Sequence, residues 1–391
     1  MNKTVAMMLS TAALAAAAGT ASPKVKPVTI PLNDGRAIPQ FGLGTYNSSV
    51  AEAKDALAVA LKLGYRHVDT AHAYRNERGV GAAVKESGIP REEIWITSKL
   101  WPTDYDHGNA AESIDKMLER LGVDYIDLVY LHQPVGDYMA GWRGLEEAVK
   151  QGKIKSIGIS NFDMDEHAFD EIIAKAKIRP AIVQIELHPY AQRKAFREKC
   201  KKLGIAVEGW FPLGGTGGNA TLFGDKTIKE LAAKYKKSPA QIILRWHVQE
   251  GFSTIPGARN PDYIKENIEV YNFKLSEDDM KKIRGLDKEK RFFTSTLAEI
   301  QHFKDWNPRR LKAVIAADRL FTMRHTHSGH KNYALRDRPE IIYIKGNRFK
   351  EIFNEKGGSH EKNHLDSFIT SSRSLYGSRK ENPRRLLFPR R

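Results

Sequence analysis

Eight short apolar segments recur along this chain, and their repetition constrains the fold more than any other feature. Each is followed by a longer amphipathic stretch, and residues 50–63, 109–121 and 240–250 are clear examples. Successive apolar segments end 24 to 45 residues apart, which is typical of strand–helix units whose strands run parallel. The predicted strands end near Thr45, Asp69, Lys99, His132, Ser160, Glu186, Trp210 and Ile255.

Eight such units are the number that closes a parallel sheet into a (β/α)8 barrel. An open doubly wound sheet is the alternative. Its dinucleotide-binding form carries a G-x-G-x-x-G turn after the first strand, and no such turn follows Thr45. We therefore predict an α/β fold of the TIM-barrel class. Residues 28–40, with Asp34-Gly35 as the turn, are expected to form a β-hairpin that plugs the bottom of the barrel.

Both ends of the chain depart from this pattern. Residues 1–22 combine Lys3, an apolar run and small residues near Ala21, which is the layout of a secretory signal peptide. A disordered Ala-rich start is the alternative. The predicted division is a signal peptide at 1–22, a barrel domain at 27–308 and a C-terminal extension at 309–391. The signal-like segment predicts export, to the periplasm in a Gram-negative cell, with a cytoplasmic location as the alternative.

Most of the positive charge lies in the C-terminal extension. Residues 310–391 hold 19 Lys and Arg against 8 Asp and Glu, and therefore carry +11 of the formal net charge of +16. Such a composition cannot bury enough apolar area to fold, so disorder is expected, with binding to an anionic surface or nucleic acid as the alternative. The rest of the chain is only mildly basic, so we expect no nucleic-acid partner.

Cysteine and hydropathy exclude further classes. The single Cys200 excludes a disulfide within the chain and a multi-cysteine zinc site, and we predict no metal. No segment after residue 22 is long and apolar enough to span a membrane. We expect a monomer that acts on a small molecule.

Ionisable residues stand at the ends of three consecutive predicted strands. Asp69, Lys99 and His132 occupy these ends, and Tyr74 follows Asp69 closely. Taken singly, each has a structural explanation, such as a helix cap or a hydrogen-bonded core residue. Active sites of (β/α)8 barrels lie where the strands end, so the four side chains together predict shared chemistry.

The grouping suits carbonyl reduction, in which hydride reaches the carbonyl carbon while a proton reaches its oxygen. Tyr74 is the predicted proton donor. A free tyrosine has a pKa of about 10, and the neighbouring ammonium of Lys99 is expected to lower that pKa. Asp69 would hold Lys99 in place and keep it charged, and a neutral His132 would donate a hydrogen bond to the carbonyl oxygen. The hydride must then come from a cofactor.

Ordered motifs between residues 28 and 308 carry a resemblance to a known family. The segments GLGTY, GYRHVDTAHAYRNE, ITSKLW, DLVYLHQP, GISNF, VQIELHPY, WFPLG and SPAQIILRW occur in this order. With these motifs the chain resembles the aldo-keto reductases, in particular bacterial 2,5-diketogluconate and methylglyoxal reductases. The resemblance implies an NADP-dependent enzyme that reduces aldehydes or ketones to alcohols. It also implies a catalytic tetrad at Asp69, Tyr74, Lys99 and His132.

The resemblance further implies a cofactor extended across the top of the barrel. Ser160, Asn161 and Gln184 would bind the nicotinamide carboxamide, and Trp210 would stack on the ring. The other implied positions are Gly44, Thr45 and Tyr46 beside the cofactor, Leu213 to Gly215 at the pyrophosphate, Glu266 and Asn267 at the adenine, and Trp101 with His132 at the substrate.

The sequence departs from the family where the cofactor's 2′-phosphate is usually bound. Gly257-Ala258 stands where a Lys-Ser pair is common, and Tyr263 stands where an arginine often grips the phosphate. Arg259 is the candidate replacement, because a guanidinium binds phosphate through two hydrogen bonds. We therefore expect NADPH, with NADH possible. Phe211 is a second departure, because a small polar residue is common after the stacking aromatic.

Two other functions remain open on the sequence. Relatives of this fold include regulatory subunits that bind NADPH with little turnover. Barrels also host lyases, in which Lys99 would form a Schiff base with the substrate. The complete tetrad argues against the first, and trapping of a substrate adduct would support the second.

Overall fold

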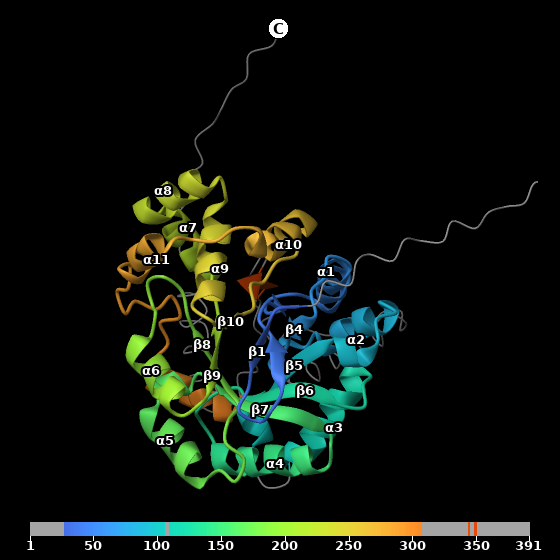
Figure 1. Cartoon of the computed structure of the whole chain (residues 1–391). Coiled ribbons are helices and arrows are strands. Elements are labelled where there is room, and N and C mark those ends of the chain that lie inside the picture. Colours follow the sequence, from blue (N-terminus) through green and yellow to red (C-terminus); the bar gives the residue numbers. More distant parts are fainter. Residues whose placement is uncertain (1–26, 106–108, 307–342, 345–347, 350–391) are drawn as a thin grey trace, which may run out of the picture.

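Eight parallel strands follow one another in chain order around a single sheet, from β3 to β10 (Figure 1). The computed structural model describes residues 27–105, 109–306, 343–344 and 348–349. All eight predicted strands are present. Their bounds are β3 (Leu43–Gly44), β4 (His67–Asp69), β5 (Trp95–Leu100), β6 (Ile126–Leu131), β7 (Ile154–Ser160), β8 (Ile182–Glu186), β9 (Ala206–Trp210) and β10 (Ser253–Thr254).

The two edges of the sheet meet and close it. The backbone N–H of Thr254 donates to the carbonyl of Gln40 at 2.9 Å, and the N–H of Gly42 donates to the carbonyl of Thr254 at 3.0 Å. Phe41 and Gly44 form parallel bridges with Thr254 and Gly257. Gly44 is required here, because a Cβ atom at this position would lie 2.6 Å from the carbonyl oxygen of Ile255. The predicted (β/α)8 barrel is confirmed.

Helices surround the strands (Figure 1). Capping fixes several of their starts: the Ser49 hydroxyl accepts from the N–H of Glu52, whose carboxylate accepts from the N–H of Ser49, so α1 begins there. The helices are α1 (Val50–Lys62), α2 (Glu77–Glu86), α3 (Asn109–Leu121), α4 (Tyr138–Lys150), α5 (Glu166–Lys175), α6 (Lys194–Lys202), α7 (Gly215–Gly224), α8 (Lys226–Tyr235), α9 (Pro239–Gln249), α10 (Pro261–Ile268), α11 (Glu277–Arg284) and α12 (Leu297–Ile300).

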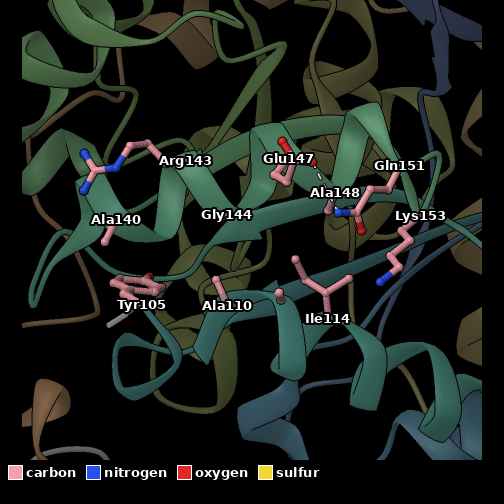
Figure 2. Close-up of a pocket in the computed structure, with 11 residues that line it drawn as sticks. Tyr105, Ala110, Ile114, Ala140, Arg143, Gly144, Glu147, Ala148, Gln151 and Lys153 are labelled. Carbon is pink, nitrogen blue, oxygen red and sulfur yellow. Dashed lines mark hydrogen bonds between the residues drawn. The ribbon is translucent and has the colours of Figure 1, made fainter. Parts of the chain in front are cut away.

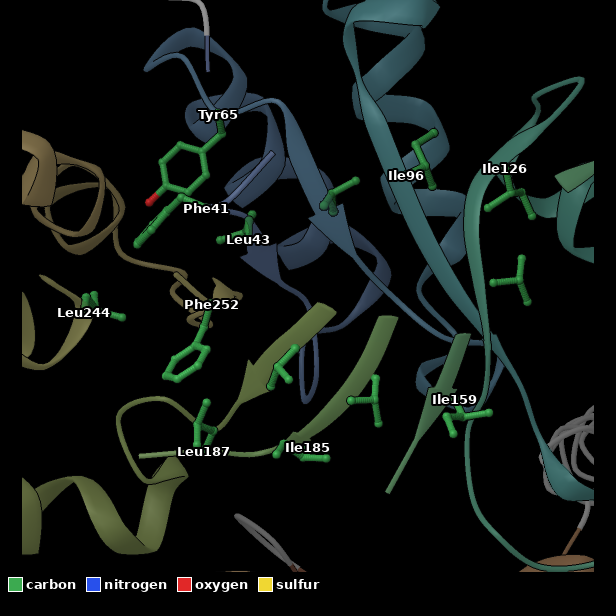
Figure 3. Close-up of a cluster of buried hydrophobic side chains, with 14 of the residues drawn as sticks. Phe41, Leu43, Tyr65, Ile96, Ile126, Ile159, Ile185, Leu187, Leu244 and Phe252 are labelled. Carbon is green, nitrogen blue, oxygen red and sulfur yellow. The ribbon is translucent and has the colours of Figure 1, made fainter. Parts of the chain in front are cut away.

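Apolar side chains fill the layer between the strands and the helices. Residues alternate between the two faces of a strand, so every second side chain points out of the barrel toward the helices. Figure 3 shows part of this layer, with Ile96, Ile126, Ile159 and Ile185 from four strands and Leu244 from α9. This continuous core holds the strand ends in fixed positions.

A second apolar cluster closes the barrel at the opposite end from the ionisable residues. The strands β1 (Thr29–Pro31) and β2 (Ala37–Pro39) pair antiparallel, and the hairpin places Leu32 and Ile38 against inward-facing side chains such as Leu128. The turn is fastened to the sheet, because the Ser156 hydroxyl donates to the Asp34 carboxylate at 2.6 Å. The predicted hairpin plug is confirmed.

The predictions for the two ends of the chain fall mostly outside the described residues. The segment at 1–22 lies there entirely, as does most of 309–391, where only the paired strands β11 (Tyr343–Ile344) and β12 (Arg348–Phe349) are described. The domain boundaries therefore stay predictions. Within the described part of the chain, no helix combines the length and apolar character needed to cross a membrane.

Candidate active site

Four predicted side chains come together where the strands end. Asp69 ends β4, Lys99 lies on β5, and His132 directly follows β6. Tyr74 ends a single 3-10 turn, η1 (His72–Tyr74), which follows β4. Asp69 is 1% exposed and Lys99 is 0% exposed, whereas Tyr74 is half-buried. The strand ends thus bring one half-buried tyrosine next to a buried ion pair.

The ion pair uses the whole hydrogen-bonding capacity of the ammonium. Lys99 Nζ donates to both carboxylate oxygens of Asp69 at 2.6 Å and to the carbonyl of Thr70 at 3.0 Å. An ammonium has three N–H donors, so all are engaged, and Nζ lies 5.0 Å from the centroid of the Tyr74 ring. Lys99 therefore faces the Tyr74 ring without donating a hydrogen bond to its hydroxyl.

The acidity of Tyr74 differs from the expectation. Burial, followed by the negative charge of Asp69, raises the pKa of the Tyr74 phenol well above its usual 10. The predicted lowering by Lys99 is wrong for this state of the protein, because the nearest anion and desolvation outweigh an ammonium that is already paired. Tyr74 consequently stays protonated at neutral pH.

His132 is neutral, as expected. Burial lowers the pKa of His132 well below its usual 6.5, and the positive charge of Lys99 and the neighbouring His72 act in the same direction. The imidazole ring lies 5.7 Å from the Tyr74 ring and 5.1 Å from Trp101, measured between ring centroids. Its Nδ1 atom is buried without a hydrogen-bond partner in the described residues. A neutral imidazole beside Tyr74 suits a hydrogen-bond donor to a carbonyl oxygen.

Glu208 on β9 is a buried carboxylate that the sequence interpretation missed. It accepts hydrogen bonds from Gln184 Nε2 at 2.7 Å, the Tyr130 hydroxyl at 3.0 Å and the Ser253 hydroxyl at 2.6 Å. Gln184 Nε2 also donates to Asp69 at 2.8 Å, so one amide bridges the two carboxylates. Burial raises the pKa of Glu208. Strand alternation was the available signal, since Glu208 lies two residues before Trp210 and shares its face.

A second missed pair links the turn that carries Tyr74 to the next loop. His72 Nδ1 lies 2.7 Å from an oxygen of Asp104, in the 3-10 turn η3 (Pro102–Asp104) that follows Trp101. The Ser113 hydroxyl donates to the other oxygen of Asp104 at 2.9 Å. The two turns are 32 residues apart in the chain, so no local pattern predicts this contact.

Ser160, Asn161 and Gln184 gather beside the tetrad. Asn161 Nδ2 donates to the carbonyl of His132 at 3.0 Å and to the Ser160 hydroxyl at 3.2 Å. Because both amide hydrogens of Gln184 face carboxylates, its oxygen faces the Ser160 hydroxyl, 3.4 Å away. Asn161 Oδ1 is buried and accepts no hydrogen bond from the described residues. A carboxamide group such as that of nicotinamide fits these acceptors.

The end of β9 and the segment after it provide a flat ring and a close backbone approach. The centroid of the Trp210 ring lies 4.7 Å from that of Phe211 and 5.8 Å from that of Phe293. Gly214 and Gly215 have φ values of 81° and 61°, and a Cβ atom at Gly215 would lie 2.8 Å from the Phe211 ring. Helix α7 begins at Gly215, where free N–H groups suit an anion such as a pyrophosphate. Leu213 instead packs against the core.

The remaining predicted cofactor residues divide into exposed and internal groups. Tyr46 is 47% exposed. Arg259 is exposed, donates to the carbonyl of Asn47 at 2.8 Å and lies 3.6 Å from the Glu52 carboxylate. By contrast, Thr45 is buried, with its hydroxyl on the carbonyl of Asp69 at 2.9 Å. Asn267 is also buried, and the Glu266 carboxylate accepts from the Ser238 hydroxyl. The structure therefore gives Thr45 and Asn267 packing roles of their own.

A surface cavity of about 360 Å³ lies elsewhere, between α3 and α4 on the outside of the barrel (Figure 2). Small side chains such as Ala110 and Ala148 line it, and Arg143 and Glu147 stand at its border. None of the predicted site residues contributes to it. Across the described ranges, no group of three or more His, Cys, Asp or Glu side chains is arranged to hold a metal ion.

Comparison with known proteins identifies the family. A family model described as the aldo/keto reductase family matches residues 40–288. Methylglyoxal reductase DkgA of Escherichia coli (strain K12) is 42% identical over 270 residues, which cover 68% of this chain and 95% of that protein. Glyoxal reductase of Bacillus subtilis (strain 168) is 42% identical over 265 residues, which cover 67% and 94%.

A solved structure agrees with these sequence matches. The Bombyx mori aldo-keto reductase in complex with NADP has a TM-score of 0.65 and 31% sequence identity, over 71% of this chain and 97% of that one. The predicted resemblance is thus confirmed for the part of the chain that forms the barrel. This chain belongs to the aldo/keto reductase family.

Proposed function

We propose that this protein reduces aldehydes or ketones to alcohols with NADPH, and that Tyr74 donates the proton. One observation carries the proposal: the buried Lys99–Asp69 pair faces the ring of a protonated, half-buried Tyr74, beside a neutral His132. The names of the two bacterial relatives, both reductases of small dicarbonyl compounds, support the reaction class. The NADP complex of the Bombyx mori relative supports the cofactor.

Each member of the tetrad has a distinct part in the proposed reaction. A bound nicotinamide would supply the hydride. The Tyr74 hydroxyl donates its proton to the carbonyl oxygen, and a ring N–H of His132 donates a hydrogen bond to the same oxygen. The Lys99 ammonium, fixed by Asp69, does not lower the pKa of the resting phenol, but its positive charge 5.0 Å from the centroid of the Tyr74 ring would offset part of the negative charge that develops there as the proton leaves.

The chain's own residues offer contacts for each part of the cofactor. The amide oxygens of Asn161 and Gln184 would accept hydrogen bonds from the carboxamide, and the Ser160 hydroxyl could donate one to it. The Trp210 ring would lie against the nicotinamide. The backbone at Gly215 would bind the pyrophosphate, with Leu213 packed behind it. Gly44, Thr45 and Tyr46 would border the cofactor, and Glu266 and Asn267 would lie at the adenine, as the family resemblance implies.

Cofactor choice depends on Arg259. Its guanidinium can bind a 2′-phosphate, so we expect a preference for NADPH. The same guanidinium already contacts the Asn47 carbonyl and the Glu52 carboxylate. Because the phosphate has to compete with this carboxylate, we also expect measurable activity with NADH. Initial rates with both cofactors, measured at equal concentrations, decide between them.

The proposal is tested by following NADPH consumption with 4-nitrobenzaldehyde. Steady consumption with formation of the alcohol is expected. Tight NADPH binding without turnover would instead identify a regulatory nucleotide-binding subunit and overturn the proposal.

The Schiff-base lyase is tested separately. Oxygens of Asp69 and Thr70 surround the Lys99 Nζ atom, so the nitrogen is directed at these acceptors and not at a position where it could attack a carbonyl carbon. Treatment with borohydride and a carbonyl substrate is expected to leave Lys99 unmodified. A reduced adduct on Lys99 in the peptide mass spectrum would favour the lyase.

Cellular location and assembly extend the proposal. The segment at 1–22 keeps its prediction of export, with the cytoplasm as the alternative, and the monomer stays a prediction. Fractionation of cells that express the full chain, and sedimentation of the purified protein, decide these points.

A further inference from the structure

Arg75, which directly follows Tyr74, has an unusual backbone and an unusual environment. Its φ of 59° lies in the left-handed region, where residues other than glycine are uncommon. The conformation ends η1, and the N–H of Arg75 donates to the carbonyl of His72 at 3.2 Å. This turn places a guanidinium at the same end of the barrel as the tetrad.

Arg75 differs from the other half-buried arginines of the described residues. Each of the others has at least one side-chain ion pair or hydrogen bond, whereas Arg75 has neither among the residues that the structure describes. Its Nε atom is buried without a partner in this part of the chain. The partnered arginines are Arg66, Arg91, Arg120, Arg193, Arg197, Arg245 and Arg291.

Aromatic rings connect Arg75 to the tetrad. Its guanidinium lies 5.9 Å from the centroid of the Trp306 ring. The Trp306 ring lies 5.2 Å from that of Trp101, whose indole N–H donates to the Trp306 carbonyl at 2.8 Å. Trp101 in turn lies 5.1 Å from His132. The cation therefore borders an apolar surface that leads to the proposed reaction centre.

Among the residues that the structure describes, no carboxylate forms an ion pair with Arg75. Burial lowers the pKa of its guanidinium, and no carboxylate in the described ranges counteracts this effect. A partly desolvated cation without a partner costs free energy, which an anionic ligand would offset. A guanidinium binds a carboxylate through two parallel hydrogen bonds.

We propose that Arg75 is a specificity-determining residue that selects carbonyl substrates bearing a carboxylate over neutral ones. The inference rests on the proposed function, because it places the carbonyl at Tyr74 and His132. The rings of Trp101 and Trp306 separate this centre from Arg75, so the preferred substrate carries its carboxylate across an aromatic ring or a chain of similar length.

The test compares two aldehydes that differ at one end only, where one carries a carboxylate and the other its neutral methyl ester. With NADPH, kcat/KM is measured for 4-carboxybenzaldehyde and for its methyl ester. Because hydrogen bonds to charged groups are worth about 1.5–3 kcal/mol, the wild-type ratio of acid to ester should be about 10 to 100. The Arg75→Gln variant should bring the ratio close to one, mainly through a higher KM for the acid.

Two further variants make the test specific. Arg75→Lys keeps the charge without the planar fork and should give an intermediate ratio. If the Gln variant does not fold, the ratio measured for the Lys variant still tests the role of Arg75. Arg143→Gln changes an exposed arginine on α4 and should leave the ratio at its wild-type value.

The outcomes separate the inference from the function on which it rests. A wild-type ratio near one, with both aldehydes reduced, overturns the role of Arg75 and leaves the proposed reductase intact. An unchanged ratio in Arg75→Gln has the same meaning. If neither aldehyde is reduced, the proposed function itself fails.

Discussion

The two ends of the barrel interior are built from the same strands but have opposite chemistry. At the hairpin end, Leu128 and Ile182 belong to the same apolar cluster as Ile38. Two residues further along the chain, Tyr130 and Gln184 form hydrogen bonds to a buried carboxylate. A strand advances by about 7 Å over two residues. A single strand can therefore supply apolar packing at one end and hydrogen-bonding groups of the candidate site at the other.

The charged end is tolerated because its two buried carboxylates are hydrogen-bonded. Asp69 accepts from Lys99 and Gln184, and Glu208 accepts from three donors. Buried ionised groups are expensive unless they are paired and hydrogen-bonded. The comparison between the ends therefore predicts that substitutions at the charged end affect both stability and activity, whereas those at the hairpin end affect stability alone.

The largest expected effect on stability comes from breaking the ion pair. Lys99→Met leaves the Asp69 carboxylate buried without its cation, and the free energy of unfolding should fall by about 3–5 kcal/mol. Urea denaturation at pH 7 measures it. Lys175→Met is the matched control, because Lys175 pairs with Glu171 on the surface and should contribute less than about 1 kcal/mol. An equal loss of unfolding free energy in the two variants would contradict the predicted difference between the buried and the surface ion pair.

A change in pH is expected to have an intermediate effect on stability, through His67 at the boundary between the two ends of the barrel. His67, two residues before Asp69, contacts the carbonyl of Pro39 in the hairpin and the hydroxyl of Thr97. Burial lowers the pKa of His67 to about 4. Between pH 6.5 and 4 the unfolded chain binds a proton that the folded chain does not, so stability falls as pH falls.

The size of this pH effect follows from the difference between the pKa of His67 in the folded and in the unfolded chain. Between pH 7 and pH 4.5, His67 should remove about 2–3 kcal/mol of the free energy of unfolding. Urea denaturation at both pH values, on wild type and on His67→Gln, isolates the contribution as a difference. A pH dependence that is identical in the two proteins would show that His67 is not held neutral.

The smallest expected effect is at the hairpin end. Ile38→Val removes one methylene group from the plug, and the free energy of unfolding should fall by about 0.5–1.5 kcal/mol. The kcat of the folded protein should not change, because the hairpin lies at the far end of the barrel. A large loss of kcat without unfolding would break the proposed separation between the two ends.

The sequence predicted the strands well, since apolar period and spacing are local properties. It also located Asp69, Lys99 and His132, because each ends a strand and barrels place such residues at one rim. Glu208 escaped, since an acidic residue within a strand looks like an exposed position until the barrel interior is built. The contact between His72 and Asp104 depends on how two distant turns pack.

The acidity of Tyr74 was the least predictable property. The position of Lys99 at the end of the neighbouring predicted strand suggested a lowered pKa. The outcome depended on the number of ammonium N–H groups that Asp69 and Thr70 already use, and on how deeply the phenol is desolvated. Both are properties of the packed structure, which no spacing encodes.

The central claim is that the phenol at the charged end transfers the proton, and one comparison tests it most directly. Tyr74→Phe and Tyr125→Phe make the same change at opposite ends of the barrel, since Tyr125 precedes β6 and lies between Arg91 and Lys155. Single-turnover NADPH oxidation with 4-nitrobenzaldehyde should slow by about 100- to 10,000-fold in Tyr74→Phe, with NADPH affinity retained, and should be unchanged in Tyr125→Phe. An unchanged rate in Tyr74→Phe would contradict the account.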